Sequence, residues 1–111
     1  MSPNHIAEFE QMVLLATLQS GEEAYAPEIR TVLEERAGRS ASRGALYRTF
    51  DRMESKGWIE WEVEDSAPIP ERGGAPMRRF RVTAEGRRVL GRSRRALLNL
   101  WDGIEPELEK A

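Results

Sequence analysis

The sequence predicts a mainly helical domain that carries one small β-hairpin. Three observations lead to this prediction. In four segments apolar residues recur every three or four positions, which is the period of a helix with one buried face. Residues 58–64 and 77–83 alternate apolar and polar side chains, which is the period of a half-buried strand. The stretch between these two runs is rich in proline and glycine and has no periodicity, so it predicts the connecting loop.

The length and composition indicate one compact domain without a metal or cofactor site. The chain has 111 residues and no cysteine, so neither a disulfide nor a thiolate metal site is expected. Its one histidine, His5, lacks the partners that a zinc site or a catalytic base needs. We expect no metal and no cofactor. Without a long apolar run or a signal-peptide pattern, we also expect no membrane contact and a cytoplasmic location.

The first two helices are predicted to build the core. A start at Ser2-Pro3 and an end near Ser20-Gly21 bound the first helix, because proline fits the first helical position. The second helix should run from Ala26-Pro27 to Ala37-Gly38. The apolar residues that should face the core are Ile6, Phe9, Met12, Val13, Ala16 and Leu18 in the first helix and Ile29, Val32 and Leu33 in the second.

The third helix has the clearest boundaries. Ser42 can cap its first turn, and Gly57 can take the left-handed conformation that ends it. Leu46, Phe50 and Met53 form its buried stripe. Since only a short turn separates it from the second helix, the pair predicts a helix-turn-helix, in which the later helix enters the major groove of DNA.

Basic residues cluster although the net charge is −2. Residues 36–52 and 72–95 hold 14 of the 17 basic residues, while most acids lie elsewhere. This segregation predicts a basic face. The third helix carries part of that face, because the side opposite its buried stripe bears Arg43, Tyr47, Arg48 and Arg52. Arginine can bind phosphates or the edge of guanine.

The last helix is predicted to join two copies of the chain. Thr83 can cap it, and Glu85 suits the positive end of the helix dipole. Its apolar residues follow a short coiled-coil pattern, which Arg94 interrupts. Pro106 should end or kink the helix near Glu105. The residues expected at the dimer interface are Leu90, Leu97, Trp101, Ile104 and Leu108.

Together these elements predict a winged helix-turn-helix, mainly α with a small β-hairpin (α+β), followed by a C-terminal dimerisation helix. Residues 1–83 should form the winged-helix DNA-binding domain and residues 84–111 the dimerisation helix, packed as a single unit.

Two motifs resemble the PadR family of transcriptional regulators. Residues 42–57 are similar to its recognition helix, which typically has Ser-x-Gly-x-Leu-Tyr followed by an apolar and charged run to glycine. Residues 74–86 are similar to its wing, and Tyr25 with Ile29 to the start of its second helix. The resemblance extends from about residue 12 to 101. Where many members have arginine and tyrosine, this chain has Met77 and Phe80, and its loop 66–73 is longer.

The resemblance implies a homodimeric repressor of transcription. Each subunit would place its recognition helix in a major groove of a palindromic operator, with half-sites roughly 34–36 Å apart. The C-terminal helices would hold the dimer together. Some members of the family bind aromatic or drug-like molecules near that interface. Trp101 is therefore expected either to anchor the dimer or to stack on a small aromatic effector.

Eight residues are expected to contact double-stranded DNA. Arg43, at the start of the recognition helix, is the first choice for a base edge. In the same helix, Gly44 would let the backbone approach a phosphate, and Tyr47 would reach a phosphate with its hydroxyl. The remaining contacts, with phosphates or a groove, are assigned to Arg48 and Arg52 in the helix and to Arg72, Arg78 and Arg79 in the wing.

Two other classes of function are compatible with a small domain of this kind. A winged helix that binds protein rather than DNA is favoured by the net acidity and by the acidic strand Glu60–Glu64, and opposed by the clustered arginines. An enzyme would need a nucleophile–base pair, a metal cluster or a phosphate-binding glycine loop. The sequence has none of these motifs, so we expect no catalytic residues.

Overall fold

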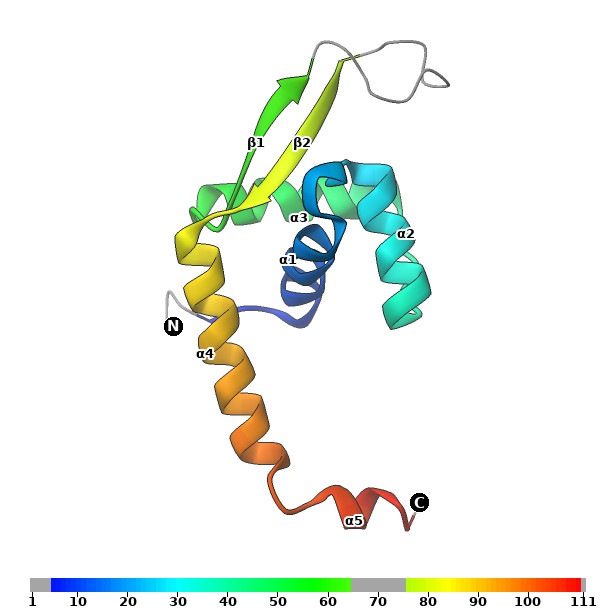
Figure 1. Cartoon of the computed structure of the whole chain (residues 1–111), viewed down its shortest axis with the longest axis vertical. Coiled ribbons are helices and arrows are strands. Elements are labelled where there is room, and N and C mark those ends of the chain that lie inside the picture. The colour runs from blue at the N-terminus through cyan, green and yellow to red at the C-terminus, as the bar shows by residue number, and fades with distance from the viewer. Residues whose placement is uncertain (1–4, 65–75, 111) are drawn as a thin grey trace.

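The structure is a computed structural model that describes residues 5–64 and 76–110. Three helices form a body from which a hairpin rises on one side and α4 extends on the other (Figure 1). The predicted fold class, mainly helical with an antiparallel hairpin and a C-terminal helix, is confirmed. The elements in chain order are α1 Glu8–Ser20, η1 Gly21–Glu23, α2 Ala26–Ala37, α3 Arg43–Ser55, β1 Ile59–Glu64, β2 Met77–Val82, α4 Ala84–Trp101 and α5 Glu105–Leu108.

One apolar core joins the three-helix body to the base of the hairpin and to the start of α4. The predicted stripe of α3, formed by Leu46, Phe50 and Met53, is buried in it. The core also contains Trp58, directly before β1. Its other large members are Val13, Leu14, Ile29, Leu33, Ile59, Phe80, Val82, Val89 and Leu90.

The first helix begins later than predicted. Helix α1 starts at Glu8, and the expected start at Ser2-Pro3 lies outside the described residues. The physical reason is a local hydrogen bond: the backbone N–H of Ala7 donates to Oε1 of Glu10 at 3.0 Å and so fixes the first turn there. Leu18, predicted to face the core, is exposed.

The ends of α2 and α3 agree with the prediction because their signals are local. Gly38 follows α2 in the left-handed conformation, with φ 62°. The side chain of Ser42 accepts a hydrogen bond from the backbone N–H of Ala45 at 3.0 Å and caps α3. Gly57 follows α3 with φ 78°. Residues within the turn itself, Gly38 and Ser42, therefore determine where α2 ends and where α3 begins.

The hairpin pairs antiparallel, with Trp61 opposite Phe80 and Val63 opposite Arg78. The backbone N–H of Phe80 also donates to the carbonyl of Ala24 at 2.9 Å, which ties β2 to the segment between α1 and α2. Of the apolar residues that alternate along β1, Ile59 is buried, whereas Trp61 and Val63 lie farther out. Both are exposed, because the outer half of the hairpin rises beyond the helical body (Figure 1). The predicted loop lies, up to residue 75, outside the described residues.

The C-terminal helix is capped as predicted but ends earlier. The Thr83 hydroxyl oxygen accepts from the backbone N–H of Gly86 at 3.0 Å. Helix α4 ends at Trp101, and Gly103 turns the chain with φ 82°. Pro106 neither ends nor kinks α4, because it lies in the first turn of the separate helix α5. The predicted seam is therefore not one continuous helix. No described helix is long and apolar enough to cross a membrane.

Candidate nucleic-acid interface

The exposed side of α3 carries a ridge of residues spaced by four, three and four positions. These residues are Gly44, Arg48, Asp51 and Ser55, and all four are exposed. They lie opposite the buried stripe, as the period of a helix requires. A Cβ added to Gly44 would meet only the guanidinium end of Arg48, at 3.2 Å. The helix therefore presents accessible backbone at Gly44, between Arg43 and Arg48.

A row of alternating arginine and aromatic side chains joins α3 to the hairpin. The guanidinium of Arg43 lies 5.5 Å from the ring centroid of Tyr47. Arg78 lies 5.9 Å from the same ring and 4.3 Å from the ring of Trp61. We call these four residues the arginine–aromatic row. Such cation–π contacts contribute about 0.5–1 kcal/mol each at exposed sites, so the row holds the recognition helix and the wing in one arrangement.

The three arginines on this surface have no acidic partner. Across residues 5–64 and 76–110, no ion pair joins Arg43, Arg48 or Arg78 to a carboxylate. No carboxylate of the described residues therefore neutralises their charge, which suits these side chains to binding an anion. Trp61 was not foreseen as part of the site. The antiparallel register could have indicated it, because Trp61 and Arg78 lie on the same face of the hairpin.

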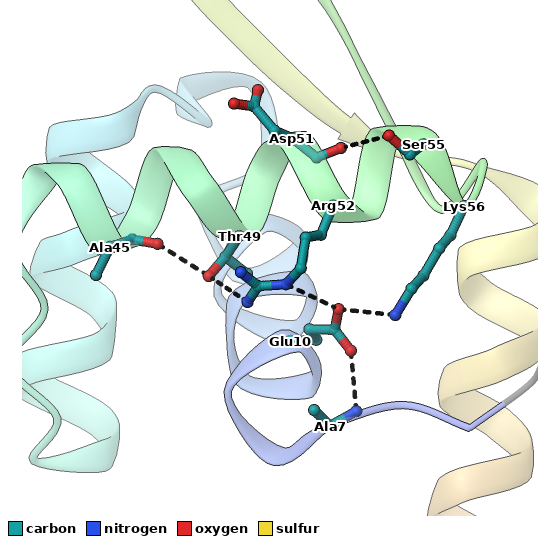
Figure 2. A network of polar contacts seen from close by, with 8 residues as sticks. All are labelled: Ala7, Glu10, Ala45, Thr49, Asp51, Arg52, Ser55 and Lys56. Atoms are coloured by element: carbon teal, nitrogen blue, oxygen red, sulfur yellow. Dashed lines mark hydrogen bonds and ion pairs between the residues drawn. The ribbon is translucent and has the colours of Figure 1, made fainter. Parts of the chain in front are cut away.

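Two other predicted contacts, Arg52 and Arg79, are engaged with acids. The Nε atom of Arg52 lies 3.7 Å from Oε2 of Glu10, and its Nη2 donates to the Thr49 hydroxyl at 3.2 Å. Figure 2 shows Arg52 turned toward α1, away from the side of α3 that carries Asp51. Arg79 lies on the face of β2 opposite Arg78, where two acids of β1, Glu62 and Glu64, bind it at 2.6 and 2.9 Å. Arg72 lies outside the described residues.

The acid that holds Arg52 is itself buried. Glu10 is 2% exposed, and Lys56 Nζ donates to its Oε2 at 3.0 Å (Figure 2). Burial raises the pKa of the Glu10 carboxyl, but the Ala7 N–H, Lys56 and Arg52 outweigh that effect, so its pKa lies below the ordinary 4.5. The three charges fasten the recognition helix to α1.

Replacing Glu10 with glutamine is expected to destabilise the protein by about 1–2 kcal/mol at pH 7, because two cations lose their partner. Because the pKa of Glu10 is lower in the folded than in the unfolded state, its carboxylate stabilises the fold at pH values above the unfolded-state pKa. This contribution is lost as the pH falls through the folded-state pKa. The difference between wild type and E10Q should thus be largest above pH 5 and shrink below pH 4.5. Urea unfolding over this pH range measures it. The exposed Glu35→Gln serves as the control, and an equal effect there would contradict the role of burial.

A second polar cluster holds the hairpin at its other face. The hydroxyl of Tyr25, at the start of α2, donates to Oε2 of Glu64 at 2.5 Å, and Glu64 also binds Arg79. The pKa of the Tyr25 phenol is raised, first because its hydroxyl donates to Glu64, and further because the phenol is buried and lies beside the negative charge of Glu64. Arg79 is thus built into the support of the wing, while Arg78 lies on the face shared with α3.

The residues predicted for a dimer interface fall into two groups. Leu97, Trp101, Ile104 and Leu108 are 42–52% exposed, so their apolar surface is available to a partner. Leu90 is only 8% exposed and belongs to the core of its own chain. Leu90 is buried because it lies in the second turn of α4, and the first turns of this helix pack against the hairpin. Leu98 and Leu100 add further exposed apolar surface.

The described residues hold no candidate cluster of metal ligands. Within them, no group of three or more His, Cys, Asp or Glu side chains could hold a metal ion. Instead, Arg43 and Arg48 on α3 and Arg78 on the adjacent wing have no carboxylate partner within residues 5–64 and 76–110, which makes this a surface suited to a polyanion.

Comparison with known proteins identifies the family. The model of the "Transcriptional regulator PadR-like family" matches residues 14–92. A PadR-like transcription factor from Bacteroides fragilis has 25% sequence identity and a TM-score of 0.68 over 86% of this chain and 85% of that one. A PadR family transcriptional regulator from Eggerthella lenta DSM 2243 has 28% identity and a TM-score of 0.66 over 94% and 88%. None of the curated proteins matches.

These relatives are transcriptional regulators, a class of protein that generally has no enzymatic activity. The match covers the helix-turn-helix, the hairpin and the first half of α4, and so includes α3 and the wing, which carry Arg43, Arg48 and Arg78. The chain therefore belongs to the PadR-like family of DNA-binding transcriptional regulators.

Proposed function

We propose that this protein is a repressor that binds a palindromic operator as a homodimer. The observation that carries the proposal is the set of three arginines, Arg43, Arg48 and Arg78, on α3 and the neighbouring face of the wing, which form no ion pair with any carboxylate in residues 5–64 and 76–110. Unpaired cations on a helix that can enter the major groove supply both the attraction to phosphates and the means to recognise bases.

The structure favours some of the expected contacts over others. We assign Arg43 to a base edge, Gly44 to the approach of a phosphate, and Tyr47, Arg48 and Arg78 to phosphates or groove edges. Arg72 remains an expected wing contact from the sequence. Arg52 and Arg79 are tied to Glu10 and to Glu62 and Glu64, so we assign them chiefly to holding α3 and the wing in position.

Selection from a pool of random duplexes tests this function. We expect enrichment of a palindrome whose half-sites lie roughly 34–36 Å apart on one face of the DNA, as two recognition helices related by a twofold axis require. Weak binding without any preferred sequence would contradict the proposal. It would favour the alternative function, a winged helix that recognises a protein.

The proposed dimer rests on the exposed apolar side chains of α4 and α5. Leu97, Trp101, Ile104 and Leu108 project from the part of the chain that extends beyond the body (Figure 1). Exposed apolar surface of this kind marks an interface in a soluble protein. Leu15 and Leu18 on α1 are also exposed and could share in it. We propose that residues 1–83 bind DNA and residues 84–111 form the dimer. This division is one of function and not of packing, because the first turns of α4 belong to the core of the body.

Leu97→Glu is expected to shift the protein from dimer to monomer at micromolar concentration, because a carboxylate would be buried without a partner in the interface. The fold should persist, since Leu97 is 42% exposed in the single chain. Asn99→Glu introduces the same side chain at an exposed neighbouring position of α4 and should leave the dimer intact. Sedimentation velocity measures both masses. A dimer unaffected by L97E would place the interface elsewhere.

We also propose Trp101 as the stacking surface of a small aromatic effector at the dimer interface. Titration with a planar dye such as proflavine should quench tryptophan fluorescence, and Trp101→Phe should remove most of that change. The other tryptophans are well placed for the control: Trp58 is buried, and Trp61 lies in the arginine–aromatic row. Quenching that persists in W101F would assign the dye to another site.

A further inference from the structure

One acid stands in the middle of the exposed ridge of α3. Asp51 follows Arg48 by three residues and precedes Ser55 by four, and its side chain is exposed. Figure 2 places it on the side of α3 opposite Arg52 and Lys56, the residues that bind Glu10. If α3 enters the major groove, Asp51 enters with it.

The carboxylate of Asp51 has no partner within the described part of the chain. The arginine next to it, Arg52, turns to Glu10 and Thr49 instead. The Ser55 hydroxyl donates to the backbone carbonyl of Asp51 at 3.0 Å, not to its carboxylate. No side-chain contact among the described residues therefore accounts for an acid at this position.

An acid on a DNA-binding surface is repelled by phosphates at every sequence. A carboxylate can only accept hydrogen bonds, and the amino donors in the major groove are N4 of cytosine and N6 of adenine. The adenine N6 group lies beside the acceptor N7 of the same base, which repels a carboxylate, so cytosine is the better match. The N7 and O6 atoms of guanine and the O4 atom of thymine are acceptors, so they would add to the repulsion. Asp51 thus lowers the affinity for a DNA site that lacks the matching donor more than the affinity for a site that has it.

From this placement we infer that Asp51 is a specificity-determining residue that accepts a hydrogen bond from the N4 amino group of a cytosine in each half-site. The inference rests on the proposed function, because it requires α3 to lie in the major groove of an operator. Arg48, one turn earlier on the same ridge, would anchor the helix there. The spacing of three residues lets both side chains reach the same stretch of groove.

The test compares duplexes that carry each of the four base pairs at every position of the selected half-site. Wild type is expected to prefer cytosine at one position by about 10-fold, the usual cost of one mismatched pair. In Asp51→Ala this preference should disappear, while binding to the other three duplexes becomes stronger because a repelling charge is gone. Asp51→Asn should shift the preference toward adenine, which asparagine recognises through N6 and N7.

Glu54→Ala is the matched control, since it removes one exposed acid from the same helix away from the ridge. It should strengthen binding without changing any base preference. If D51A strengthens binding to all four duplexes equally and every preference persists, Asp51 is only a repelling charge and the inference is wrong. If wild type itself selects no sequence, the proposed function fails, and the assignment of Asp51 fails with it.

Discussion

Replacing Gly86 with alanine is expected to lower the free energy of unfolding by about 3 kcal/mol, the upper part of the range for an overpacked site. A Cβ at this position would lie 2.3 Å from the carbonyl oxygen of Trp58 and 2.8 Å from Cγ1 of Val82. The Trp58 carbonyl cannot retreat easily, because it also accepts a hydrogen bond from the backbone N–H of Thr83 at 3.0 Å. The glycine therefore lets α4 approach the base of the hairpin.

Urea unfolding of G86A measures this loss, and Gly91→Ala on the same helix is the matched control. A Cβ at Gly91 would meet only the guanidinium of Arg95, at 3.4 Å. Alanine favours a helix over glycine by about 1 kcal/mol, so G91A should be neutral or more stable than wild type. Equal effects of the two substitutions would contradict the close packing of α4 on the hairpin.

Removing the three unpaired arginines is expected to have the largest effect on DNA binding. In the triple variant Arg43→Ala, Arg48→Ala and Arg78→Ala, affinity for the selected operator should fall roughly 10⁶-fold, since the dimer loses six charged contacts and each contributes roughly 1.5 kcal/mol. The slope of log affinity against log salt should also become shallower by about 5, close to 0.9 for each of the six phosphate contacts that the dimer loses. If one of these arginines contacts a base instead of a phosphate, its loss should lower the affinity but leave the salt slope nearly unchanged.

A second triple variant removes the same amount of positive charge from other parts of the chain. It distinguishes direct DNA contacts of the α3–wing surface from the general attraction of a positive charge to DNA. Arg36, Arg87 and Arg95 are exposed and form no ion pair within residues 5–64 and 76–110, but they lie on α2 and α4. Replacing these three with alanine should reduce affinity only slightly and leave the salt slope nearly unchanged. If both triple variants lose affinity equally, the total charge rather than the α3–wing surface determines binding.

The parts of the fold that the sequence predicted correctly depend on local signals. Ser42 and Thr83 cap helices through bonds to residues three positions away, and Gly38 ends α2 by its own backbone conformation. The errors came from competing signals. Pro3 suggested a helix start, but Glu10 fixes the first turn later, and Pro106 opens a new helix instead of bending an old one.

The candidate site was predictable in composition but not in detail. The clustering of arginine indicated which segments form the basic surface, yet the partners that distinguish one arginine from another come from distant segments. Arg52 meets Glu10 only because α3 packs on α1. Arg78 is held by Trp61 across the hairpin and by Tyr47 from α3. Such pairings require the tertiary structure, which a periodicity analysis of single segments does not supply.

The central claim is that α3 and the wing of a dimer bind an operator through unpaired arginines. The most direct test is the binding of wild type to the selected duplex at several salt concentrations, with the mass of the complex measured by sedimentation. We predict one dimer per palindrome and a log–log salt slope of about −5 or steeper, since each phosphate contact contributes close to −0.9 and a dimer doubles the contacts. A monomeric complex with a slope near zero would contradict the account.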